Sequence, residues 1–277
     1  MDKEARGAII GMVFGDAYVN VRKRLAKGRY EYESSELRVL HSIHQKDYCE
    51  HKAALLRKYL GGNFSVKIQK NGQGGKFLAA SFSVSNTYFK LIKKWTYPFG
   101  KKTFTRQALD FLTPEGIAIW YMDDGHARRN VNKDGYTSSV STSIATMCSK
   151  EEVELIIAWF LEKHAIQFKE RFDKRCRPDQ AWFIECNTEN SRLFAHLVRP
   201  FIIDSMLYKL AHVADLSSHE CRDPIGACVH CGSKIYDARF KGLCSSCYSK
   251  KRYREIRKHL GYDIVRPYGK KTVRTSG

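Results

Sequence analysis

The 277-residue sequence has no apolar run close to the ~20 residues that a membrane-spanning helix needs. Its first residues, Met1–Arg6, include two acids where a secretory signal has basic and then apolar residues. Nine cysteines, an odd number in a chain without such a signal, argue against a disulfide framework. A Gly-rich phosphate loop of the Walker type is also missing, and we expect no small-molecule cofactor. We therefore expect an intracellular protein, in a bacterial or phage-infected cytoplasm or in an organelle, that is neither secreted nor membrane-bound.

Acidic residues are scarce as well. There are 29 Asp and Glu against 48 Lys and Arg, which gives a formal net charge of +19. This balance is typical of proteins that bind the phosphate backbone of nucleic acids, and RNA-binding proteins share it. Residues 222–277 contain 14 Lys and Arg but 4 Asp and Glu, so they hold +10 of the charge. The end of the chain is therefore expected to be a basic unit of its own.

Four of the nine cysteines form two CxxC pairs, separated by twelve residues, in this basic unit. Thiolates at this spacing can hold one Zn²⁺ tetrahedrally, and a unit of some 55 residues has too little core to fold easily without such a crosslink. Two incidental pairs, or a redox motif without its usual βαβ setting, are the alternatives. The predicted ligands of a structural zinc are Cys228, Cys231, Cys244 and Cys247.

Basic residues follow the second CxxC pair on a predicted helix from Tyr248 to about Leu260. We expect this zinc module to add DNA contacts, although a stabilising cap or a protein-binding finger is the competing interpretation. The residues expected to contact DNA there are Lys250, Lys251, Arg252 and Arg254.

The first 210 residues contain an internal repeat. Two apolar helical stretches end in acids, Asp16 and Asp124, and similar patterns follow each of them. The order in each half is α-β-β-α-β-β-α, which predicts an α+β fold of two pseudo-symmetric halves. The predicted helices are 45–60 and 149–164, and the predicted strands include 30–37, 63–70, 77–85, 136–144, 167–174 and 181–187. The expected domains are 1–112, 113–216 and the zinc-finger-like extension 217–277.

Two similar halves in one chain suit a target whose halves are related by approximate symmetry, as in duplex DNA. Antiparallel strands can read base edges in a major groove with alternate side chains while their other face packs on helices. A plain solvated sheet face is the alternative for any single position. The strand residues expected to contact DNA are Lys67, Gln69, Lys169 and Arg171.

Three glycines, Gly7, Gly11 and Gly15, recur every fourth residue along the first apolar helix. Glycine in a helix costs up to ~1 kcal/mol, so this stripe indicates that another helix approaches closely. We expect the second apolar helix to be that partner and to bring the two terminal acids together, where they can bind a divalent metal. The side chains expected to fill the glycine groove are Ile119, Trp120, Tyr121 and Met122.

Residues 9–17 and 117–125 resemble the two copies of the LAGLIDADG motif in single-chain homing endonucleases. The resemblance covers about residues 1–215. In the first copy Phe14 stands where the motif has its first acid, and Ala17 replaces the terminal glycine. The last acid of the motif is present in both copies, as Asp16 and Asp124.

This resemblance implies a saddle of two four-stranded sheets over the DNA major groove, with the motif helices at the interface between the halves. It implies that catalytic Mg²⁺ binds at Asp16, Asp124, Ala17 and Asp123. It also implies that Lys102 and Lys209 act beside the metal, with Lys101 as the rival of Lys102. We assign no role to the His41-x₂-His44 pair, which lacks a companion acid or cysteine at metal spacing.

The sequence thus predicts a monomeric homing endonuclease that makes a staggered double-strand break in a long pseudo-palindromic DNA site by Mg²⁺-dependent hydrolysis. One alternative is an RNA maturase that assists splicing of its host intron. Another is a catalytically inactive, sequence-specific DNA-binding regulator, which would not need to keep both acids.

Overall fold

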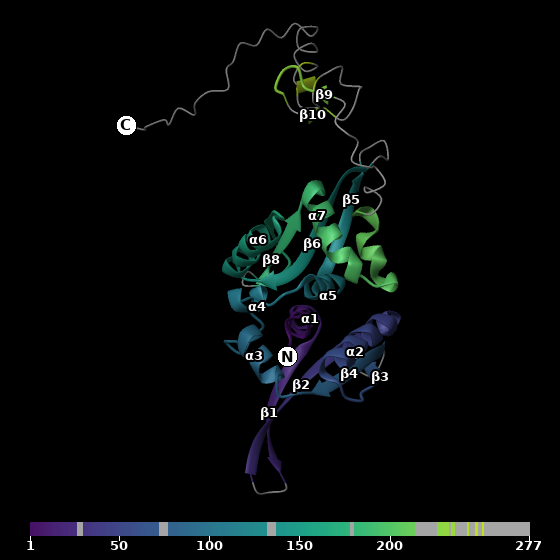
Figure 1. Cartoon of the computed structure of the whole chain (residues 1–277), viewed down its shortest axis with the longest axis vertical. Coiled ribbons are helices and arrows are strands. Elements are labelled where there is room, and N and C mark those ends of the chain that lie inside the picture. The colour runs from purple at the N-terminus through teal and green to yellow at the C-terminus, as the bar shows by residue number, and fades with distance from the viewer. Residues whose placement is uncertain are drawn as a thin grey trace, which may run out of the picture. The chain divides into compact units, whose positions relative to one another are not determined.

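The structure, a computed structural model (Figure 1), describes most of the chain. The described residues are 1–26, 30–71, 77–131, 137–177, 180–213, 226–232, 234–235, 243, 247–248 and 251. The chain divides into two compact units, Met1–Ser218 and His219–Gly277. The expected division of the first unit at residue 112 remains a prediction.

The first half of the larger unit has the predicted order of elements. Its four strands form an antiparallel sheet in the order β1-β2-β4-β3, and the helices pack on one face of it (Figure 1). The elements are α1 (Lys3–Phe14), β1 (Tyr18–Ala26), β2 (Tyr30–Ser42), η1 (Ile43–Gln45), α2 (Lys46–Leu60), β3 (Lys67–Asn71), β4 (Phe77–Ser85) and α3 (Phe89–Thr96).

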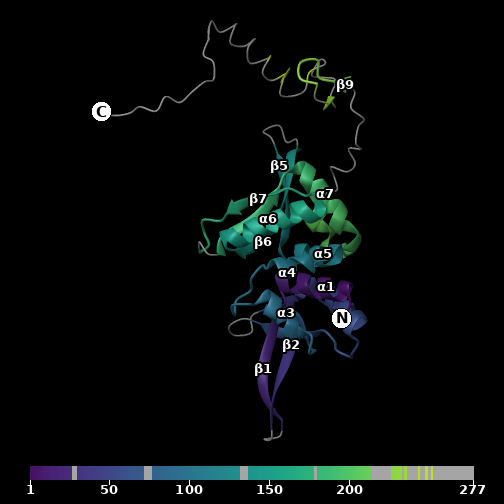
Figure 2. The ribbon, with the colours of Figure 1, turned by 60° about the vertical axis from the view of Figure 1, so that its left-hand side comes forward.

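The second half repeats this arrangement after a short helix, α4 (Arg106–Asp110). Its antiparallel sheet has the equivalent order β5-β6-β8-β7, so the prediction of two α-β-β-α-β-β-α halves is confirmed. The elements are α5 (Pro114–Asp124), β5 (Gly125–Val131), β6 (Thr137–Cys148), α6 (Lys150–His164), β7 (Phe168–Phe172), β8 (Trp182–Cys186), α7 (Thr188–Val198), η4 (Arg199–Phe201) and η5 (Asp204–Leu210). In Figure 2, α1 and α5 lie side by side between the two halves.

Side-chain caps fix where the central helices begin. Asp2 accepts a hydrogen bond from the Ala5 N–H at the start of α1, and Thr113 does the same for Gly116 in α5. At α6, Ser149 and Glu152 form the predicted capping box. These caps set the register of α1 and α5 and hence the position of the acids that follow them.

The strand register separates a face covered by helices from a polar outer face. In β2, Leu37 and Val39 are buried. Lys67 and Gln69 lie on the opposite face of that sheet and are exposed. Lys169 is exposed on the corresponding face of the second sheet. The alternation expected from the sequence is present in β2 and β6, whereas Ile68 of β3 and Glu170 of β7 are exposed although they lie on the other face.

In the second unit, the described residues include a small hairpin of β9 (Gly226–Ala227) and β10 (Lys234–Ile235). None of the helices in the described part of the chain combines the length and apolar composition of a membrane span.

Candidate active site

The two motif helices, α1 and α5, cross at backbone contact. A Cβ atom on Gly11 would overlap the carbonyl oxygen of Gly116, and one on Gly116 would overlap that of Gly7. Gly15 faces the side chain of Asp123 in the same way. Only glycine allows this approach, because any larger side chain would push the helices apart.

The expectation that bulky residues of α5 fill the glycine groove is wrong. The groove is so narrow that the α5 backbone at Gly116 and the side chains of Thr113 and Asp123 occupy it. The bulky residues pack elsewhere in the core: the ring of Trp120, for example, contacts those of Phe14 and Phe104. All four are fully buried: Ile119, Trp120, Tyr121 and Met122.

The crossing brings Asp16 and Asp124 to one end, where both line a hollow of about 300 Å³ together with Lys102. The Asp16 side chain is 47% exposed. Burial raises the pKa of Asp124 to about 7; Lys102 opposes this rise, while Asp123 and Asp16 add to it. The two motif acids therefore repel each other, and a divalent cation would relieve that repulsion. Carboxylate oxygens are also the donors that Mg²⁺ prefers, so these residues fit the implied metal.

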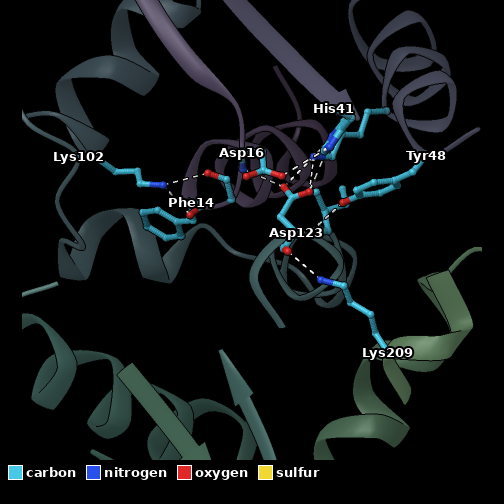
Figure 3. A network of polar contacts seen from close by, with 10 residues as sticks. Phe14, Asp16, His41, Tyr48, Lys102, Asp123 and Lys209 are labelled. Carbon is cyan, nitrogen blue, oxygen red and sulfur yellow. Dashed lines mark hydrogen bonds and ion pairs between the residues drawn. The ribbon is translucent and has the colours of Figure 1, made fainter. Parts of the chain in front are cut away.

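The two predicted catalytic lysines lie at equivalent places in the two halves. Lys102 Nζ donates to the carbonyl oxygens of Phe14 and Gly15, both at 2.9 Å. Lys209 Nζ donates to the carbonyl oxygen of Asp123 at 2.8 Å (Figure 3). Each lysine thus holds its charge at the C-terminal end of a motif helix, which the helix dipole favours. Lys101 lines the same hollow, but these contacts favour Lys102 for the role.

A buried polar network beside Asp16 was missed by the sequence analysis. Lys52 Nζ donates to both carboxylate oxygens of Asp123 at 2.7 Å and contacts His41 Nε2 at 3.1 Å. The Asp16 N–H donates to Asp123 Oδ2 at 3.1 Å, and His41 Nδ1 lies 3.5 Å from Asp16 Oδ2 (Figure 3). The side chains of Lys52 and Asp123 are fully buried. Burial, with Lys52 adding to it, lowers the pKa of His41 to about 3, so this ring is neutral.

Two signals in the sequence could have revealed the network. His41 continues the alternation of Leu37 and Val39 toward the core. Lys52 lies on the same helical stripe as the buried Tyr48 and Leu56. A cation on a buried stripe requires an acidic partner elsewhere, because an unpaired buried charge is very costly.

Asp16, His41 and Asp123 each have one potential metal-ligand atom, a carboxylate oxygen or a ring nitrogen, and these three atoms lie within 4.8 Å of one another. The Lys52 ammonium already neutralises Asp123 and contacts His41, so these three do not fit a metal site. The assignment of Asp123 as a Mg²⁺ ligand stays a prediction, and its side chain is already engaged by Lys52. Ala17, also predicted as a ligand, is buried and can offer only its main-chain carbonyl oxygen.

The predicted DNA-contacting residues in the two sheets lie on the outer faces. Lys169 and Arg171 line a hollow of about 520 Å³ over the second sheet, where Arg171 pairs with Glu185. Lys251 in the second unit is exposed. Three further predicted contacts, Lys250, Arg252 and Arg254, lie outside the described residues.

Three of the four predicted zinc ligands lie together. The sulfur atoms of Cys228, Cys231 and Cys247 are within 4.8 Å of one another, and those of Cys231 and Cys247 are 3.6 Å apart. Two thiolates on one tetrahedral Zn²⁺ lie about 3.8 Å apart when the Zn–S distance is about 2.3 Å, so the spacing fits. Cys244 lies outside the described residues.

Two pseudo-symmetric α+β halves that meet at paired acid-tipped helices define a double-motif, nuclease-like architecture. The chain matches the LAGLIDADG DNA endonuclease family over residues 6–194 and belongs to that family. The predicted family and enzyme class are thereby confirmed.

Proteins with sequences similar to this chain have different names. A "Probable intron-encoded endonuclease 1" of Wickerhamomyces canadensis is 27% identical over 215 residues, which are 76% of this chain and 85% of that protein. A "Cytochrome b mRNA maturase bI2" of Debaryomyces hansenii is 27% identical over 219 residues, covering 76% and 75%. A "Protein RecA" of Mycobacterium shimoidei is 26% identical over 206 residues, covering 73% of this chain but 45% of that protein.

The fold is also similar to that of the homing endonuclease I-WcaI, solved bound to its DNA recognition sequence. The TM-score is 0.58 at 24% identity, over 76% of this chain and 86% of I-WcaI.

Proposed function

We propose that this chain acts as a monomer on duplex DNA and cuts both strands at a long, pseudo-palindromic site, leaving a staggered break. The observation that carries the proposal is the meeting of Asp16 and Asp124 in one hollow at the ends of the crossed motif helices. Two sheets with polar outer faces flank those helices within the same unit. A maturase or an inactive regulator would not need two motif acids that repel each other.

In this mechanism each group of the chain has a distinct task. Asp16 and Asp124 would hold Mg²⁺, and its charge would supply a more acidic attacking water and stabilisation of the leaving 3′ oxygen. Lys102 and Lys209, which donate to carbonyl oxygens at the C-terminal ends of the motif helices, place positive charge where the phosphate gains negative charge. The outer sheet faces bind the duplex and fix which phosphates reach the acids.

The proposal is tested by selecting cleaved molecules from a randomised duplex library with Mg²⁺. We expect one extended target class cut on both strands, and no cleavage when EDTA replaces Mg²⁺. Binding without cleavage of any duplex would support the regulator, and selective binding of the host intron RNA would support the maturase.

Cleavage is expected to need more Mg²⁺ as the pH falls below about 7. Asp124, whose pKa is raised to about 7, is ionised above that pH and protonated below it, and only the ionised form binds metal. The Mg²⁺ concentration for half-maximal cleavage should rise about fivefold between pH 7 and pH 6, and about tenfold per pH unit below that, as expected for one displaced proton. Metal-free DNA binding measured at the same pH values is the control, and a flat Mg²⁺ requirement would contradict the role of Asp124.

We further propose that the second unit is a zinc-stabilised module that adds DNA contacts. Its support is the convergence of three cysteine sulfurs and the high positive charge of residues 222–277. Purified protein should contain one Zn²⁺ per chain, and Cys228→Ser should lower that content.

Removal of residues 222–277 is expected to weaken DNA binding and to flatten its salt dependence. Every phosphate that the shortened protein no longer neutralises reduces the magnitude of the slope of log K against log[salt] by about 0.9. Binding isotherms at several salt concentrations measure this slope. An unchanged slope and affinity would show that the module serves another partner or only stability.

A further inference from the structure

A chain of buried polar groups connects the two halves of the larger unit beside Asp16. It runs from Asp123 in α5 of the second half to Lys52 in α2 and His41 in β2 of the first half. The side chains of Lys52 and Asp123 are fully buried, and that of His41 is 1% exposed. The chain ends at the half-exposed carboxylate of Asp16 (Figure 3).

The contacts determine which nitrogen of His41 carries its hydrogen. A lysine ammonium only donates, so the 3.1 Å contact with Lys52 makes His41 Nε2 the acceptor. In a neutral imidazole the hydrogen then resides on Nδ1, which lies 3.5 Å from Asp16 Oδ2. Lys52 therefore favours the tautomer in which the His41 Nδ1–H faces the Asp16 carboxylate across a long contact of 3.5 Å, and Gln45 also hydrogen-bonds this ring.

The strand equivalent to β2 has a different residue at this position. Tyr18 and His126 each follow their motif acid by two residues and pair with Arg38 and Ser143, respectively. Three residues further along β2 and β6 are His41 and Thr146, the latter within a register shift between Ile144 and Cys148 that has no counterpart in the pairing of β2 with β4. The Thr146 hydroxyl donates to the carbonyl oxygen of Trp182 at 2.8 Å instead of to a motif acid.

Lys52 and Asp123 also have no equivalent of the same residue type in the other half. Helices α2 and α6 have the same length, and the residue six positions after their first is Lys52 in α2 and Ile156 in α6. Asp123 in the second motif corresponds to Gly15 in the first. In both halves the helix residue is fully buried, so the fold accommodates an apolar side chain where the first half has an ammonium.

This asymmetry indicates that the network serves something other than stability. A buried ion pair rarely stabilises a protein more than apolar residues of similar volume do. The second half has such an apolar residue, Ile156, at the position of Lys52. Polar groups that contact a metal-binding carboxylate, as His41 contacts Asp16 at 3.5 Å, can orient it, and loss of such outer partners typically lowers activity 10- to 100-fold.

We propose that His41, fixed by Lys52 and Asp123, is a positioning residue for Asp16, so that the two catalytic centres are inequivalent and cut the two DNA strands at different rates. The inference rests on the proposed nuclease function. It adds three residues, His41, Lys52 and Asp123, to those that govern cleavage, although none of them needs to touch DNA or metal.

Strand-resolved cleavage of the selected duplex, with each 5′ end labelled separately, tests this inference. His41→Leu removes the N–H and approximates the volume, whereas His41→Asn can restore an N–H near the place of Nδ1. We expect His41→Leu to slow one strand about 10- to 100-fold and the other less than about twofold. His41→Asn should recover part of the loss, and the control His44→Leu, at an exposed neighbouring position, should keep the wild-type ratio.

The double variant Lys52→Met/Asp123→Asn supplies a second route to the same result. It removes both buried charges together and keeps an acceptor oxygen for the Asp16 N–H. Its strand ratio should move in the same direction as that of His41→Leu. Single-turnover rates with excess protein make this ratio insensitive to a reduced folded fraction.

The outcomes separate this inference from the function on which it rests. A wild-type protein that cuts neither strand of any duplex would overturn the proposed function. A wild-type protein that cuts, with variants that slow both strands equally or neither, would overturn only the positioning role.

Discussion

Asp16→Asn and Asp124→Asn are each expected to lower double-strand cleavage at least about 100- to 1000-fold while leaving DNA binding nearly intact. Each change removes one negative charge from the hollow where the two acids repel each other, so divalent metal binds far more weakly. Loss of a single group that stabilises developing charge is typically worth this factor. The residues proposed to bind DNA lie on the sheets and are untouched, so the affinity for the duplex should persist.

Single-turnover cleavage and binding isotherms on the same target measure the two properties separately. Asp47→Asn is the matched control, because Asp47 is an exposed acid of α2 that lines a different hollow. If either motif variant still cuts both strands at the wild-type rate, the assignment of these acids to the metal is wrong.

Gly11→Val is expected to destabilise the larger unit by at least about 3 kcal/mol, or to prevent its folding. The added Cβ alone would overlap the main chain of Gly116, which cannot move without separating the motif helices. Those helices belong to one continuous core that spans both halves, so the strain cannot be confined to one surface. Marginal stabilities of 5–15 kcal/mol leave little reserve against such a loss.

Urea unfolding followed by circular dichroism measures this effect. Lys3→Ala, an exposed change on the same helix, should stay within about 0.5 kcal/mol of the wild type. A Gly11→Val protein as stable as the wild type would show that the helices do not cross at backbone contact.

Much of the architecture could be predicted because short-range sequence patterns determine its helices and strands. The helix and strand periods and the Ser149–Glu152 capping box each depend on residues near one another in the chain, and the repeat appears as the same order of these patterns twice. The structure contains all of them. The glycine stripe predicted a close helix contact for the same reason.

The partner of that stripe could not be predicted from pattern alone. Helix α5 is buried on all sides, so its composition does not show which of its faces meets α1. The angle and distance at which the two helices cross place Thr113, Gly116 and Asp123 against the glycines of α1.

The network around Lys52 escaped prediction because its members are distant in sequence. Lys52 and Asp123 are 71 positions apart, and His41 lies on a third element. In the sequence, a single histidine or lysine cannot be distinguished from an ordinary polar surface residue. Its role can be recognised only from the fold, which places it next to an acid.

The measurement that tests the central claim most directly is anomalous diffraction from crystals of the complex between this protein and its selected duplex, soaked with Mn²⁺. We predict Mn²⁺ within coordination distance of carboxylate oxygens of both Asp16 and Asp124, next to a DNA phosphate, with the Lys52–Asp123 ion pair intact. Metal bound instead by His41 and Asp123, or no metal near either motif acid, would contradict the account.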